Sequence, residues 1–159
     1  MLFSRINRSN PEKVFMVVYN SYSTASLTNG QPVMWDYATD ADGVGVTLNA
    51  AGTGRAGHYG TAVAGVAAET IAAGAYGLVQ VYGYHSAVRV RSATGGNPAI
   101  AAGTGLALVT NTVFCLESYA AAAAATSTIT LHNAHWCGFA LAAQASWTTK
   151  AIAVFLKCL

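Results

Sequence analysis

Charged residues are scarce in this 159-residue chain. Only 9% of its residues are Asp, Glu, Lys or Arg, against about 25% in an average soluble protein. Eight basic and six acidic side chains leave a net charge of +2. Nucleic-acid binders neutralise many phosphates with Lys and Arg, so this scarcity disfavours direct nucleic-acid binding. Dispersed charge also keeps proteins apart. We therefore expect partners to cover much of the surface.

Other absences narrow the function further. No run of about 18 apolar residues is present, so we expect no membrane span, and the charged first residues do not resemble a secretory signal. The odd, widely spaced cysteines, Cys115, Cys137 and Cys158, favour reduced thiols over a disulfide framework. Common hydrolase and phosphate-loop motifs are missing. With few titratable residues for acid–base chemistry, we expect no enzyme and no cofactor.

Two segments contain residue types that occur in ligand sites. Gly52–Gly57 matches the G-x-G-x-x-G pattern, but no strand ends at its first glycine and no carboxylate ends the next strand, so we expect a loop. His132, His135 and Cys137 lie within six residues, as zinc ligands can. Alternation along a strand would point the two histidines to opposite faces. We assign no metal, and the sequence leaves open whether this cluster binds one.

Short β-branched and aromatic segments separated by Gly, Asn and Pro fill most of the chain. This pattern predicts an all-β fold, a small β-barrel or sandwich of short antiparallel strands. The alanine run 119–126 is left as a helical turn or a loop, because so short a helix is marginal alone. The expected strands are 14–19, 33–37, 44–48, 78–84, 87–91, 106–109, 113–117, 128–132, 138–142 and 151–156, with 62–68 open between strand and helix.

One short pattern occurs twice. Ile71-Ala-Ala-Gly74 and Ile100-Ala-Ala-Gly103 each lead into a β-type run, at an offset of 29 residues. Two copies do not make a repeat array, which needs about three. We interpret them as matching turns that lead into strands of one β-barrel.

Residues 1–13 are polar and lack periodicity, which predicts an N-terminal arm before a β-barrel domain over residues 14–159. Such a segment is either a frayed terminus or an arm that docks on a neighbour. In the expected strand 87–91, arginines alternate with valines, so one face of the strand is exposed to solvent or contacts a partner. The candidate residues for docking on a partner or on another protomer are Arg5, Arg8, Lys13, Arg89 and Arg91.

Several stretches resemble the decoration, or cement, proteins on the capsids of tailed bacteriophages. They are Leu27–Asp36, Ala64–Gly83, Ile100–Leu108, Gly138–Ala142 and Ala151–Leu156. The resemblance consists of turn-and-strand patterns and does not include residues 119–126 or 132–137. It implies a virion protein, made in the host cytoplasm, that binds the major capsid protein on the outside of the shell, often as a homotrimer, and stabilises the shell.

The alternative is a β-sandwich binding module of a phage fibre, or a carbohydrate-binding domain. The three tryptophans and eight tyrosines could line a sugar-binding face. Aromatic residues on strands more often belong to a core or an interface, so the capsid hypothesis is preferred.

Overall fold

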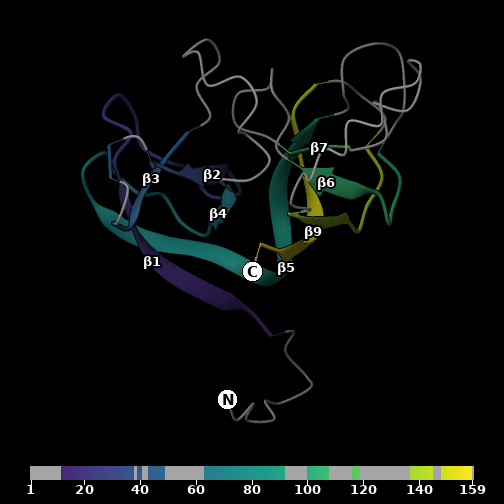
Figure 1. Ribbon diagram of the computed structural model, residues 1–159. Helices are drawn as coiled ribbons and strands as arrows, with labels where there is room; N and C mark the ends of the chain where they lie inside the picture. The colour runs from purple at the N-terminus through teal and green to yellow at the C-terminus, as the bar shows by residue number, and fades with distance from the viewer. Residues whose placement is uncertain are drawn as a thin grey trace, which may run out of the picture.

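The computed structural model describes residues 12–37, 39–40, 43–48, 63–91, 100–107, 116–118, 137–144 and 148–158. Every regular element within these ranges is a β-strand, so the predicted all-β class is confirmed (Figure 1). The strands are β1 (Val14–Asn20), β2 (Pro32–Trp35), β3 (Gly45–Thr47), β4 (Val63–Ala67), β5 (Tyr76–Arg91), β6 (Gly105–Ala107), β7 (Leu116–Ser118), β8 (Gly138–Ala140) and β9 (Lys150–Lys157).

The longest strand differs from the prediction. Residues 78–84 and 87–91 were expected as two strands, but they form the single 16-residue strand β5. Gly83 has φ +96°, and the register with β9 shifts between His85 and Val88. A glycine and a bulge bend and twist a strand without ending it. The predicted strand 128–132, the run 119–126 and the loop 52–57 lie outside the described residues.

The strands pair in two closed circuits that share β5. In the first circuit, β1 pairs with β3, β3 with β2, β2 with β4, β4 with β5, and β5 with β1. In the second, β5 pairs with β7, β7 with β6, β6 with β8, β8 with β9, and β9 with β5. Figure 1 shows the two circuits side by side, with β5 running beneath the first and then turning upward into the second.

The two circuits repeat the same topology. Each has one parallel pair, β1–β3 in the first and β5–β7 in the second, and four antiparallel pairs. The isolated bridge Leu27↔Ile71 recurs as Ile100↔Gln144, with both residue numbers higher by 73. Thus β5 serves as the last strand of the first circuit and as the first strand of the second.

The backbone hydrogen bonds repeat with the same offset of 73. The amide of Gly30 donates to the carbonyl of Ala67 at 2.8 Å, and the amide of Gly103 donates to that of Ala140 at 2.8 Å. Gly65 and Gly138, also 73 residues apart, have φ of 152° and 154°. The chain therefore contains a structural duplication, which the short pattern at offset 29 does not reveal.

A common turn accounts for the short pattern. In the segments 27–31, 71–75 and 100–104, an i to i+3 hydrogen bond of 3.1 Å closes the turn. Gly30, Gly74 and Gly103 stand at the third position with φ of 80°, 73° and 88°. A positive φ at this position is a requirement of type II turns and favours glycine. The same strand-leading turn therefore occurs three times in the described residues.

The apolar side chains gather in two core clusters that follow the two circuits, except that Val66 of β4 belongs to the cluster of the second circuit. The first contains Val18, Leu27, Val33, Val46, Leu48, Ala64, Ala67, Ile71, Val79 and Val81. The second contains Val66, Val88, Val90, Ile100, Leu106, Cys137, Ala140, Val154 and Leu156. Cys158 packs against both. Because β5 runs unbroken through both circuits, no linker divides them at this strand. The single domain over residues 14–159 stays a prediction.

Candidate interaction face

Two neighbouring strands of the first circuit present apolar side chains to solvent. Alternate residues of β1 point inward, where Val18 joins the core and Met16 packs against it. The residues between them face outward and pair in register with β5, Val17 with Leu78 and Tyr19 with Tyr76. We call Phe15, Val17, Tyr19, Tyr76 and Leu78 the β1–β5 apolar face.

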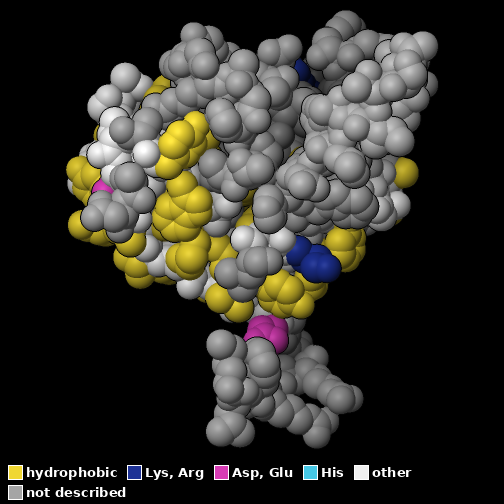
Figure 2. Space-filling model, viewed as in Figure 1, with side chains coloured by type: hydrophobic (Ala, Val, Ile, Leu, Met, Phe, Trp, Pro, Cys, Tyr) yellow, Lys and Arg dark blue, Asp and Glu magenta, His cyan; other side chains and the backbone are white. Residues whose placement is uncertain are grey.

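This face is unusually exposed for its composition. Val17 is 61% exposed and Tyr76 68% exposed. Four of the seven large hydrophobic residues that are exposed among the described residues belong to it: Phe15, Val17, Tyr76 and Leu78. Figure 2 shows hydrophobic side chains gathered at the lower left, over β1 and the first part of β5, with few charged groups among them. Contiguous apolar patches of this kind mark interaction sites more often than single exposed residues do.

Aromatic residues continue along the sheet into the second circuit. The ring of Phe155 stacks on Phe139 and meets Tyr82 edge-on, with both centroid distances at 5.3 Å. These rings are half-buried. On the β1–β5 apolar face, the rings of Tyr19 and Tyr76 lie 5.2 Å apart. Aromatic side chains packed in this way are rigid, so they lose little conformational freedom when a partner binds to them.

The three basic docking candidates that the structure describes, Lys13, Arg89 and Arg91, have different neighbours. Lys13 is exposed at the start of β1, with its ammonium 5.9 Å from the ring centroid of Tyr84. Arg89 donates from Nη2 to the hydroxyl of Thr28 at 2.8 Å, so its side chain joins the two circuits. Arg91 is half-buried and pairs through its backbone with Glu117 of β7. Arg5 and Arg8 lie outside the described residues. A docking role for these five residues stays a prediction.

His85 lies at the junction between the circuits and is buried. Its Nδ1 accepts a hydrogen bond from the amide of Ala87 at 3.2 Å, and the imidazole also bonds to the backbone of Ala67 in β4. Burial lowers the pKa of His85 below its ordinary value of 6.5; the bond to Ala67 opposes this, and the charge of Lys13 adds to it. The neutral ring with its proton on Nε2 fits both neighbours.

Acidification is expected to destabilise the protein through this histidine. The unfolded chain takes up a proton near pH 6.5, but the folded chain takes it up only at lower pH. The neutral imidazole of His85 therefore makes its full contribution to the free energy of unfolding above pH 6.5. This contribution is lost as the pH falls through the folded-state pKa. Denaturant unfolding between pH 7.5 and 5.5, compared with His85→Asn, measures the effect. If the free energy of unfolding changes with pH in the same way in both proteins, His85 does not cause the loss of stability.

The described residues hold no obvious site for a metal ion. Among them, no three His, Cys, Asp or Glu side chains gather closely enough to ligate one. His132 and His135 lie outside the described residues, so the cluster with Cys137 is not tested. Asp40 has a backbone role, since its carboxylate accepts a hydrogen bond from the amide of Gly45 at 2.7 Å. Within the same ranges, no helix has the length and apolar character that a membrane crossing requires.

Comparison with known proteins adds no relative. A scan against protein-family models finds no match, and a search of curated proteins finds no significant one. The function of the protein is therefore inferred from its own surface.

The β1–β5 apolar face could not be located from the sequence, because the sequence pattern predicts both strands but not that they pair side by side. The available signal was the segment Val14–Tyr19, in which both alternating faces are apolar. A strand with one wet face should alternate between apolar and polar residues. Two apolar faces on one strand therefore indicate a second packing partner.

Proposed function

We propose that this protein is a structural virion protein that binds the major capsid protein on the outside of an icosahedral phage capsid and stabilises the shell. The observation that carries the proposal is the β1–β5 apolar face, presented by a chain with 9% charged residues. Burying a Val, Leu or Phe side chain contributes about 1.5–3 kcal/mol. A patch of this kind can thus anchor a protein interface without charge pairing.

The repeated circuits support a scaffold role. Among the described strands, the closed circuits leave few unpaired edges, which protects an apolar protein against edge-to-edge aggregation. A shell offers many equivalent sites, and binding at several of them raises the overall affinity. We also propose a homotrimer, for which light scattering should give the mass of three chains. The protein would be made in the host cytoplasm and carried on the capsid exterior.

The deciding experiment is a capsid-binding assay. Shells are assembled from the major capsid protein encoded beside this reading frame, and occupancy is measured by co-sedimentation. Val17→Asp and Leu78→Asp place a charge in the β1–β5 apolar face and should weaken binding by about 100-fold, since 1.4 kcal/mol is tenfold in affinity. Leu141→Asp is the matched control: Leu141 is 40% exposed and Leu78 39%, but Leu141 follows β8 in the second circuit. This control should bind normally.

Each outcome separates the hypotheses. If the unaltered protein does not bind the shells, or if no capsid gene lies beside this reading frame, the capsid proposal fails. If all variants bind equally, another surface makes the contact. The alternative, a phage-fibre or carbohydrate-binding module, draws on the exposed Tyr76 beside Tyr19. A glycan array on which Tyr76→Ala abolishes the signal would favour that alternative.

A further inference from the structure

Two cysteine side chains meet where the circuits join. Cys137 stands immediately before β8 and is buried, and Cys158 follows β9 and is half-buried. A side-chain hydrogen bond links the two thiols. The thiol of Cys158 also donates to the carbonyl of Cys137 at 3.3 Å. The pair is thus in direct contact although 21 residues separate the two positions in the chain.

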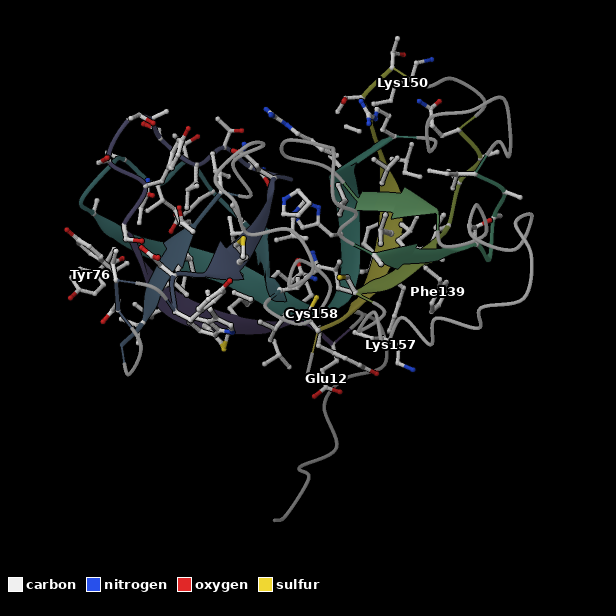
Figure 3. All side chains as sticks on the ribbon, turned by 45° about the horizontal axis from the view of Figure 1, so that its top comes forward. Glu12, Tyr76, Phe139, Lys150, Lys157 and Cys158 are labelled. Atoms are coloured by element: carbon white, nitrogen blue, oxygen red, sulfur yellow. The ribbon has the colours of Figure 1, made fainter. Side chains whose placement is uncertain are left out.

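The backbone holds this pair in place. The amide of Lys157 donates to the carbonyl of Cys137 at 2.8 Å, and the amide of Cys158 donates to Val81 of β5 at 2.9 Å. These bonds tie the end of β9 to β8 on one side and to the first circuit on the other. Figure 3 shows Cys158 between the two groups of strands, with Tyr76 and Phe139 toward opposite sides. Backbone hydrogen bonds on both sides therefore fix the positions from which the two thiols meet.

The two cysteines differ in their exposure to solvent. Cys158 is the more accessible, and the hydrogen bond from Cys137 lowers its pKa, against the opposing effect of burial. The thiolate is the form that attacks a disulfide. Cys137 is 1% exposed, so a dissolved oxidant does not reach it first. This order suits an attacking thiol with a resolving thiol beside it.

We propose that Cys137 and Cys158 form an intramolecular disulfide when the protein leaves a reducing compartment and meets a small disulfide such as oxidised glutathione. The Cys158 thiolate attacks one sulfur of oxidised glutathione, forms a mixed disulfide and releases one glutathione thiolate. Cys137 loses its proton and attacks the Cys158 sulfur, which releases the second glutathione. The two protein thiols are oxidised, and one glutathione disulfide is reduced to two thiols.

The bond would fasten the last strand of the second circuit. A disulfide needs the sulfurs to approach to about 2.05 Å, which is a small movement for side chains already in hydrogen-bonded contact. It would link β8 to the end of β9 at the point where Cys158 packs against both cores. The odd cysteine count that favours reduced thiols is compatible with this, because the bond forms only after exposure to oxidant. The inference does not depend on the proposed capsid role.

The test uses the full-length folded protein in oxidised glutathione and in dithiothreitol. Thiol labelling after denaturation should fall from three free cysteines to one, and peptide mapping should recover a Cys137–Cys158 linked pair. Cys137→Ser should instead retain one glutathione on Cys158, whereas Cys158→Ser should acquire neither bond nor adduct at Cys137. Cys115→Ser is the control and should still form the bond.

Two results would overturn the proposal. One is three free thiols in the folded protein after prolonged oxidation, while the urea-unfolded chain reacts under the same conditions. The other is a bond that always includes Cys115. Mapping of the unaltered protein decides the matter even if a serine variant fails to fold.

Discussion

Replacing Gly30 by alanine is expected to destabilise the protein by more than about 3 kcal/mol. Gly30 has φ +80°, and a left-handed conformation costs a non-glycine residue about 1–2 kcal/mol. An added Cβ would also lie 1.9 Å from the carbonyl oxygen of Ala87 in β5. That contact cannot relax by a side-chain rotation, because both groups are backbone. The turn and β5 would have to move apart. This movement would break the hydrogen bond of 2.8 Å that the Arg89 amide donates to the Gly30 carbonyl.

The structural repeat supplies a matched control. Gly103 occupies the same position of the same turn in the second circuit, with φ +88°, but a Cβ there meets nothing within 4 Å. Gly103→Ala should therefore cost only the conformational term, about 1–2 kcal/mol. Gly74→Ala is a second control, since its Cβ would meet only the Tyr19 hydroxyl at 3.6 Å.

Urea unfolding of the three variants measures these differences. The turn is the same in each, so the excess for Gly30→Ala reports the close approach between the circuits. Equal losses for Gly30→Ala and Gly103→Ala would show that the first turn is not pressed against β5. A larger loss at Gly103 would contradict the proposed packing directly.

Local features of this fold could be predicted from the sequence. The turns at Ile71 and Ile100 follow from glycine at the third position, because only glycine adopts that φ without cost. Most strands follow from alternation, as in Val88 and Val90, both of which are buried. These features depend on a few neighbouring residues, and therefore the sequence pattern specifies them.

The duplication could not be predicted, because the equivalent positions share backbone geometry and not side chains. Gln144 takes the place of Ile71, and Ile100 that of Leu27. What repeats is mainly glycine, as at Gly65 and Gly138. A search for repeated residues instead finds Ile71 and Ile100, which share a turn but lie at different places in their circuits.

The candidate face and the thiol pair depend on contacts between distant segments. Val17 meets Leu78 only because β1 pairs with β5 in one register. A shift by one residue would turn Val17 into the core. The thiol pair is likewise set by the pairing of β8 with β9. The small number of charged residues predicts that partners cover much of the surface, but it does not show where on the surface they bind.

Removing the side chain of Asn20 is expected to cost about 2–4 kcal/mol. Asn20 is fully buried at the end of β1. Its Nδ2 donates to the carbonyl of Ile71 at 3.0 Å and to that of Ala25 at 3.3 Å, and its Oδ1 accepts from the amide of Tyr22 at 3.0 Å. Asn20→Ala leaves these loop groups without their partner and also leaves a cavity.

A charged isostere sharpens this test. Asn20→Asp keeps an acceptor for the Tyr22 amide but places a carboxylate oxygen against the carbonyl of Ile71, so it should destabilise at least as much at pH 7. Protonation restores a donor, so the folded state binds the proton more tightly than the unfolded state. The stability of this variant should therefore rise relative to the unaltered protein as the pH falls from 7 to 5.

The control for both changes is Asn29→Ala. Asn29 is an exposed residue in the turn before β2, and its replacement should cost less than about 0.5 kcal/mol. Urea unfolding at several pH values compares the variants. If Asn20→Ala costs no more than Asn29→Ala, the segment between β1 and the Leu27 bridge is not held by this side chain. If Asn20→Asp shows no gain on acidification, the donor role assigned to Nδ2 is wrong.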